Sequence, residues 1–292
     1  MQPITHAFPF STLPPRLRLS GFAEFAACGH REIVLLCEFL AEMMADPSKI
    51  RWYRKALADT GTVFCDSHAP FGPQDDLNCP YDELRPASIA RKKMALEIAA
   101  SFGVDSITIH TGNVRAPGYP LEKYHANLLS ALDELLPLAE KLKITIALEN
   151  IWHPTNTVPK LLDALRRFPS EYLGICYDTG HANISSGKVR VPENNMAKVY
   201  AGGGYGEPEW NDHILEDLLP HVTTCHVHDN NGVSDEHLLP GLGTVDWGHV
   251  IPLLKSAPRI KCFQNESSPK EVSPVSIART VKTFRELFGS AS

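Results

Sequence analysis

Histidine, aspartate and glutamate residues stand in this sequence where short apolar runs end. The residues that close these runs are His68, His110, Glu149, Asp178, His181, His226, His228, Asp229 and Glu266. Imidazoles and carboxylates can ligate a cation or move a proton. Brought together, these groups would be crowded and like-charged without a cation between them. We therefore predict a metal site at the ends of these runs.

The prediction depends on repetition, because a single histidine at the end of a strand is more often a structural, hydrogen-bonded residue. Here six consecutive runs each end in His, Asp or Glu. Carboxylates with imidazoles and no thiolate suit Zn²⁺, Mn²⁺, Co²⁺ or Fe²⁺, whereas structural zinc more often uses cysteine and Ca²⁺ avoids histidine. We expect a divalent metal ion as the cofactor, with Zn²⁺ or Mn²⁺ ahead of the others.

A scaffold must bring the ends of these runs together. The apolar runs cover residues 4–8, 31–39, 62–70, 106–112, 144–151, 172–183, 222–230 and 260–267. Helical patterns lie between them, at 21–28, 46–60, 88–102, around 128–139, 159–168, 211–219 and 247–256, with a last one at 274–288. The clearest helix has a stripe of leucines from Leu128 to Leu136 at helical spacing.

Eight alternating strand and helix units favour a closed (β/α)₈ TIM barrel over an open doubly wound sheet. The runs are continuously apolar, as in parallel strands that are buried on both faces. No GxGxxG motif or P-loop follows an early run. We predict a single domain over residues 1–292, whose strand ends meet at one face. The longest irregular stretch is 184–210, and we predict a mobile loop over the strand ends at 201–210.

The composition argues against several classes of protein. The formal net charge of −6 gives no sequence-wide attraction to nucleic acid or anionic membranes. The first ten residues lack the features of a signal peptide, and the longest apolar stretch is too short to span a bilayer. Seven cysteines without a CxxC pair favour a reducing cytoplasm. We expect Cys176 and Cys225 to be small buried residues.

Five strings, in order along the chain, resemble the xylose-isomerase-like TIM barrels. They are ALEN (147–150), DTGHAN (178–183), HVHDNNG (226–232), DEHLLPGLGTVDW (235–247) and NES (265–267). The resemblance extends over roughly residues 60–292, and its second half is specific. That superfamily includes sugar isomerases and epimerases, inosose dehydratases and type IV apurinic endonucleases.

Similarity to the ketose epimerase branch implies one metal ion held by Glu149, Asp178, His226 and Glu266. In that branch the two glutamates are also the acid/base pair. They stand on opposite faces of the substrate and move a proton at the carbon next to a carbonyl, through an enediolate. His181 matches a histidine that helps to hold the substrate.

Similarity to the endonuclease branch implies three Zn²⁺ ions and nine ligands. The matching positions are His68, His110, Glu149, Asp178, His181, His226, Asp235, His237 and Glu266. However, the NNGVSDEH loop has no Lys or Arg, and no Arg occurs between Arg190 and Arg259, whereas DNA phosphates attract cations. The Arg that ketose epimerases usually carry after the strand-seven histidine is also absent.

We predict a metal-dependent isomerase or epimerase that acts on a sugar or a related polyol or keto compound. Glu149 and Glu266 are its catalytic pair, and one metal ion is tightly held. The alternatives are an apurinic-endonuclease-like phosphodiesterase and a barrel that binds a small molecule without catalysis. We expect a small carbohydrate-like partner, no membrane and no nucleic acid. The sequence does not determine the oligomeric state, and a homo-oligomer is compatible with it.

Five residues have two candidate roles. His68, His110 and His181 are predicted to bind substrate or a further metal ion, and a structural role is the remaining alternative. Asp235 and His237 are predicted either to bind a further metal ion or to order their loop.

Neighbouring positions offer alternatives for ligation and stacking. His228 could replace His226 as a ligand, because residues two apart on a strand face the same side. Trp152, Trp247 and Phe71 are candidates to stack on a sugar ring, and we assign Trp152 to substrate binding.

Overall fold

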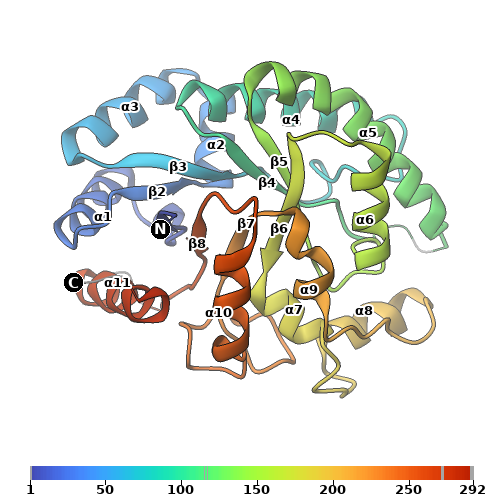
Figure 1. Cartoon of the computed structure of the whole chain (residues 1–292). Coiled ribbons are helices and arrows are strands. Elements are labelled where there is room, and N and C mark those ends of the chain that lie inside the picture. The colour runs from blue at the N-terminus through green and yellow to red at the C-terminus, as the bar shows by residue number, and fades with distance from the viewer. Residues whose placement is uncertain (1, 115, 117, 271–272, 290–292) are drawn as a thin grey trace.

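Eight parallel strands form a closed barrel in sequence order in the computed structural model, which describes residues 2–114, 116, 118–270 and 273–289 (Figure 1). The strands are β1 (Ile4–His6), β2 (Glu32–Leu35), β3 (Val63–His68), β4 (Ser106–Ile109), β5 (Thr145–Glu149), β6 (Leu173–Asp178), β7 (Val222–Val227) and β8 (Phe263–Asn265). Because β8 pairs with β1, the sheet has no open edge. The predicted (β/α)₈ TIM barrel is confirmed.

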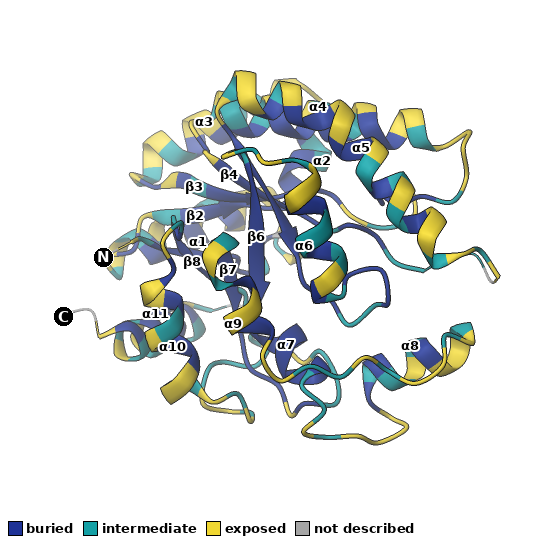
Figure 2. Cartoon of the chain, turned by 45° about the vertical axis from the view of Figure 1, so that its right-hand side comes forward, coloured by how far each residue is buried: buried dark blue, intermediate teal, exposed yellow. Residues whose placement is uncertain are grey.

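Helices surround the barrel, and those that pack on it turn their buried faces toward the strands, whereas α8 packs against α7 (Figure 2). They are α1 (Pro15–Ala27), α2 (Cys37–Ala45), α3 (Ser48–Thr60), α4 (Arg85–Ser101), α5 (Leu121–Leu142), α6 (Val158–Arg167), α7 (Thr179–Ser185), α8 (Asn195–Gly203), α9 (Ile214–Leu218), α10 (Trp247–Ser256) and α11 (Pro274–Phe288), with 3-10 turns at Phe10–Thr12 and Leu219–His221. None of the helices in the described ranges is long and apolar enough to cross a membrane.

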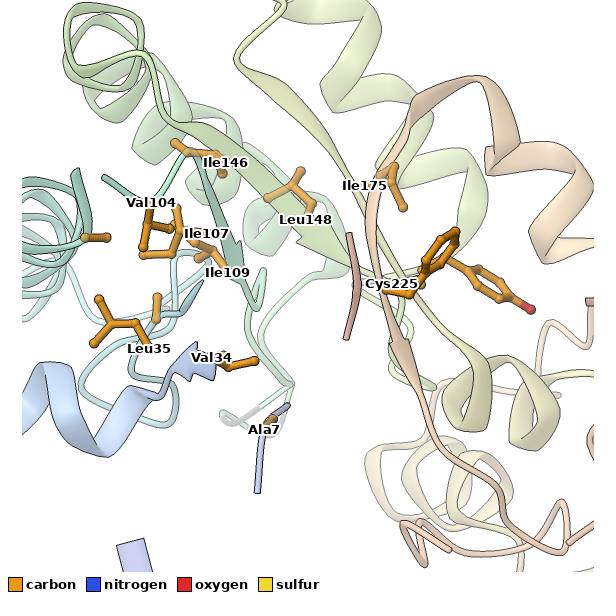
Figure 3. Packing of buried hydrophobic residues seen from close by; sticks show 14 of the residues in the cluster. Ala7, Val34, Leu35, Val104, Ile107, Ile109, Ile146, Leu148, Ile175 and Cys225 are labelled. Carbon is orange, nitrogen blue, oxygen red and sulfur yellow. The ribbon is translucent and has the colours of Figure 1, made fainter. Parts of the chain in front are cut away.

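Side chains along the strands alternate between two environments. Ile107 and Ile109 of β4 and Ile146 and Leu148 of β5 are fully buried in a hydrophobic cluster that also contains helix residues (Figure 3). The intervening positions face the opposite side, which is the interior of the barrel. Glu149 is one of these inward positions, so the alternation that builds the core also aims this carboxylate into the barrel.

Two β-bulges change this alternation where the site needs it. In β3, Phe64 pairs with Ile33 but Asp66 pairs with Val34, so Cys65 is an extra residue. A bulge of this kind re-aims the side chains that follow it. Phe64 packs in the hydrophobic cluster, and Asp66 and His68 face inward.

The second bulge lies in β7. Ile175 pairs with Val222 and Cys176 with Thr224, so Thr223 is the extra residue. Val222 packs in the hydrophobic cluster, whereas Thr224 contacts Asp66 inside the barrel. His226, two residues beyond Thr224, therefore also points inward.

Three segments differ from the sequence prediction. Residues 37–39, predicted as the end of a strand run, begin helix α2, in which Phe39, Leu40 and Met43 are buried on one face. The strand run predicted to reach residue 183 ends at Asp178. The Asp178 side chain accepts a hydrogen bond of 2.6 Å from the His181 N–H and begins α7.

The predicted irregular stretch 184–210 contains helix α8. The Asn194 side chain accepts from the N–H groups of Met196 and Ala197 and caps its first turn. The helix continues through residues 201–203 and ends at Gly204, whose φ of 67° lies in the left-handed region that glycine adopts without strain. All seven cysteines are free, and Cys176 and Cys225 are buried as predicted.

Candidate functional site

Glu149 is the centre of a buried cluster at the carboxyl ends of the strands. His110 Nε2 lies 3.0 Å and His68 Nε2 3.6 Å from its Oε2 atom. On the other oxygen, Oε1, His181 Nδ1 lies at 3.0 Å and His226 Nδ1 at 3.4 Å. The structure thus brings together residues that the sequence places at the ends of β3 to β7.

The four residues predicted to hold a metal ion converge on one another. His226 Nδ1 lies 3.1 Å from Glu266 Oε2 and 3.5 Å from Asp178 Oδ2. One ligand atom from each of Asp178, His226 and Glu266 lies within 4.8 Å of the others, and the same holds for His68, Glu149 and His226. This spacing is compatible with coordination of a common ion.

Asp235 and His237 form a further group next to this cluster. His237 Nε2 lies 3.1 Å and His181 Nε2 3.5 Å from Asp235 Oδ2. The His228 ring stacks on that of His237, with 4.0 Å between centroids. Burial lowers the pKa of His237, but Asp235 and Glu266 outweigh it and raise that pKa to about 9.

Backbone carbonyls fix the orientation of three of the imidazoles. In each of them Nδ1 hydrogen-bonds to a backbone carbonyl oxygen at 2.8 to 2.9 Å. The pairs are His68 with Ala69, His181 with Asn150, and His237 with Glu266. A carbonyl oxygen only accepts, so Nδ1 must donate. In the neutral ring the Nε2 lone pair is then available, which is the arrangement of metal-ligating histidines.

Several buried atoms of the cluster lack a hydrogen-bond partner among the described residues. They are Glu149 Oε2, His226 Nδ1 and Nε2, His228 Nδ1 and Asp235 Oδ1. Buried polar atoms are usually satisfied, and each exception costs about 1–3 kcal/mol. A cation among them would provide the missing interaction, so the donor set fits a divalent metal ion.

The charges of the cluster offset one another. Burial raises the pKa of the Glu149 carboxyl, but His110 and His226 outweigh burial and hold that pKa well below its ordinary value. Burial lowers the pKa of His181, and Asp178 outweighs it and raises that pKa well above its ordinary value. The carboxylates are therefore ionised at neutral pH, and a divalent ion would compete with protons for these ligands.

Aromatic rings border a cavity of about 230 Å³ above the cluster. The Phe71 ring stacks on His110 with 4.4 Å between centroids, and Trp152 meets His181 edge-on at 4.7 Å. Trp247 is not a lining residue of this cavity. Its Nε1 donates to Asp229 Oδ2 at 3.0 Å.

Asp229, which the sequence grouped with the strand-end residues, has a structural role. Its carboxylate also accepts from the N–H groups of Asn230, Gly241 and Val245, and so orders the loop that follows β7. Gly241 in the PGLG segment (240–243) has a φ of 88°, a conformation that glycine adopts without strain.

Two contributing residues were not assigned from the sequence. His228, weighed only as a replacement for His226, has its Nε2 3.1 Å from both Asp178 oxygens, so both histidines belong to the cluster. Asn150 exchanges hydrogen bonds with the Asp178 backbone at 2.8 and 3.1 Å and holds that residue in place. Inward alternation along β7 was the signal for His228, whereas Asn150 entered the sequence analysis only as the last residue of the ALEN string, without a role.

A model of the xylose isomerase-like TIM barrel family matches residues 22–267. The uncharacterised protein MJ1311 of Methanocaldococcus jannaschii is 28% identical over 194 residues, which cover 61% of this chain and 59% of MJ1311. The chain thus spans about six tenths of the length of that relative. The probable endonuclease 4 of Methanoculleus marisnigri is 26% identical over 225 residues, 74% of this chain and 76% of that protein.

Solved structures of known proteins share the fold. A D-tagatose 3-epimerase-like protein superimposes with a TM-score of 0.73 at 21% identity, covering 99% of this chain and 98% of that one. The IolI protein with a bound zinc atom gives a TM-score of 0.70 at 16% identity, again covering 99% and 98%. At these identities the likeness establishes the fold alone.

Proposed function

The chain belongs to the xylose isomerase-like TIM barrel family, and from this premise we propose that it is a metal-dependent isomerase or epimerase of a sugar or related polyol or keto compound. Glu149 and Glu266 are the acid/base pair. Together with Asp178 and His226 they hold one divalent metal ion, Zn²⁺ or Mn²⁺. We also propose that the substrate is a small carbohydrate-like molecule and that the protein is located in the cytoplasm.

One observation carries this proposal. Two glutamates, from β5 and from the end of β8, reach the same imidazole nitrogen of His226 at 3.4 and 3.1 Å. Glu149 Oε2 and both nitrogens of His226 also lack hydrogen-bond partners among the described residues. Two carboxylates beside one cation site are what proton transfer next to a carbonyl requires.

The residues of the site divide the work of the reaction. When bound, the metal ion supplies polarisation of the substrate carbonyl. One of Glu149 and Glu266, as the ionised carboxylate, takes the proton from the neighbouring carbon. The other must carry a proton, which it returns to that carbon, and proton exchange between the two side chains or with solvent then resets the pair.

Substrate binding falls to the histidines and the aromatic rings around the cavity. His68, His110 and His181 donate or accept hydrogen bonds with the substrate oxygens. Phe71 and Trp152 border the cavity and exclude water from the reacting carbon.

A phosphodiesterase of the apurinic endonuclease kind is the second candidate. The grouping of His181, Asp235 and His237, together with that of His68 and His110 beside Glu149, favours it, since a multinuclear site would need these extra ligands. The relative named endonuclease 4 also supports it. The absence of Lys and Arg from residues 230–237 counts against binding of DNA phosphates there.

Solvent exchange separates the two candidates. The metal-loaded enzyme is incubated in D₂O with free ketoses, including fructose, and the sugars are examined by NMR for deuterium on carbon and for new epimers. A nicking assay on an abasic-site duplex runs in parallel. We expect new sugar products and no nicking. Efficient nicking that Glu149→Gln abolishes would refute the isomerase proposal.

A further inference from the structure

The cavity at the strand ends continues beyond Phe71 into a second lobe. The first lobe, of about 230 Å³, has Trp152 in its wall, and the second measures about 290 Å³. Both are lined by His68, Phe71, His237 and Glu266, so they flank the candidate metal ligands. The second lobe is bounded by the ends of β1, β2 and β8, with Phe8, Leu36, Cys37, Glu38, Gln264 and Ser268 in its wall. A substrate held at Glu266 could extend into it.

Gln264 lies in the wall of the second lobe with an unused hydrogen-bonding side chain. Its neighbours Phe263 and Asn265 contact Phe288 and His6, so Gln264 faces the opposite side, into the barrel. The side chain is fully buried, and neither Oε1 nor Nε2 has a partner among the described residues. A buried amide left unpaired is unfavourable, which indicates that a ligand or water pairs with it.

Glu38 is a second polar residue in the wall of this lobe. It is exposed in the first turn of α2 and accepts a hydrogen bond of 3.1 Å from Cys37 Sγ. Together with Glu266 it gives the lobe two carboxylates. Of the described residues in the walls of the two lobes, none is Lys or Arg.

We propose that the second lobe binds the part of the substrate remote from the reacting carbon, and that this part is an uncharged, hydroxyl-bearing chain recognised by Gln264 and Glu38. This inference rests on the proposed isomerase function. An amide can both donate to and accept from a hydroxyl, and a carboxylate accepts from one. A phosphate at the same place would meet the Glu38 carboxylate without a Lys or Arg in the described wall, and His237 is already paired with Asp235 at 3.1 Å.

Binding measurements test this assignment without depending on turnover. The metal-loaded protein is titrated by calorimetry with D-fructose, 6-deoxy-D-fructose and D-fructose 6-phosphate. We expect the dissociation constant of fructose to be about fivefold lower than that of the deoxy sugar, which corresponds to the free energy of one neutral hydrogen bond. Fructose should also bind more tightly than fructose 6-phosphate. In Gln264→Met the preference for fructose over the deoxy sugar should disappear, because the hydroxyl loses its partner.

Two further variants complete the experiment. One controls for the loss of a buried polar group elsewhere in the fold, and the other tests the second polar residue of the lobe. Thr280→Val removes another buried hydroxyl without a partner, but on α11 and outside both lobes, and should leave all three affinities unchanged. Glu38→Ala, at an exposed position, should weaken the binding of fructose and reduce the difference in affinity between fructose and fructose 6-phosphate.

Three outcomes would overturn the assignment. They are tighter binding of the phosphate than of fructose, a preference for fructose over the deoxy sugar that survives Gln264→Met, and binding of none of the three sugars to the wild type. Failure of the isomerase proposal would look different, with fructose bound as described but no deuterium entering any sugar.

Discussion

Two buried carboxylates inside the same barrel, Asp66 and Glu149, have opposite surroundings. Asp66 Oδ1 accepts from Ser67 N at 2.8 Å and Ser106 Oγ at 3.0 Å, and Oδ2 accepts from Thr224 Oγ1 at 2.9 Å. Both its oxygens are satisfied by the protein itself. At Glu149, Oε2 has imidazoles close by but no hydrogen bond among the described residues. The fold completes the interactions of Asp66 and leaves those of Glu149 to a ligand.

The ionisation of the two groups differs in the same way. Burial raises the pKa of Asp66 above its ordinary value, because its hydrogen bonds do not fully replace water. Glu149 is buried as well, and burial alone would raise its pKa, but His110 and His226 outweigh burial and lower the pKa. Burial therefore accompanies a neutral carboxyl at Asp66 and an anion at Glu149, and only the anion suits a cation site.

The largest expected effect is loss of the metal ion from the strand-end cluster. Asp178→Asn keeps an oxygen that can cap α7 but removes the charge of a ligand, and His226→Ala removes the imidazole that lies between Asp178 and Glu266. We expect both variants to lose most bound metal and most activity, measured by elemental analysis and by turnover. The control variant Asp66→Asn should keep its bound metal and its activity. Wild-type metal content in Asp178→Asn and His226→Ala would contradict the ligand assignment.

The next largest effect separates proton transfer from ligation. Glu149→Gln and Glu266→Gln retain the shape of the side chain and part of the ligation but cannot accept a proton. We expect each to retain some metal while turnover falls on the order of 10²- to 10⁴-fold. The assay is epimer formation by NMR at matched metal occupancy. Turnover near the wild-type rate in both variants would exclude these glutamates as the acid/base pair.

A smaller effect concerns stability at Asp66. Because its folded-state pKa is raised, the contribution of this group to stability is present below its unfolded pKa near 3.9 and is lost as pH rises through the folded value. Asp66→Asn stays neutral, so we expect the free energy of unfolding of the metal-free protein to rise by about 1 kcal/mol at pH 7 and not below pH 4.

Urea unfolding at the two pH values measures this difference. The half-buried Asp163 has a lowered pKa, chiefly because of a hydrogen bond from His125, so Asp163→Asn should bring no such gain. A loss of stability at pH 7 in Asp66→Asn would show that its carboxylate is favourable as an anion.

The smallest effect is expected at the cavity wall. Trp152→Leu removes a ring beside His181 and should raise KM by about threefold, with kcat changed less, because a stacking surface for the substrate is lost. Trp247→Leu removes a ring that bonds to Asp229 away from the cavity and should leave KM unchanged. Equal KM values in the two variants would remove Trp152 from the substrate site.

The barrel could be predicted from the sequence because its strands are buried on both faces and their apolar runs stand out. The same continuity hid helix α2, since only Glu38 interrupts the apolar run between β2 and Phe39. Asp178 illustrates a second limit. Its side chain caps α7, so the chemical motif and the start of a helix coincide, and the strand was predicted too long.

The candidate ligands could be found because strand ends meet at one face of a barrel. Their orientation could not, because the bulges at Cys65 and Thr223 turn His68 and His226 inward against simple alternation. The backbone carbonyls that orient His68, His181 and His237 lie on loops whose geometry depends on the whole fold. For the same reason the second lobe beside Gln264 had no counterpart in the sequence prediction.

The central claim, that the unsatisfied strand-end cluster is a single-metal centre, is tested most directly by anomalous diffraction. Crystals of the protein loaded with Zn²⁺ or Mn²⁺ are measured at the absorption edge of the metal. We predict one full-occupancy peak among Glu149, Asp178, His226 and Glu266. A map without a peak there would contradict the claim. So would two or three full-occupancy ions bridged by Glu149, which would favour the phosphodiesterase instead.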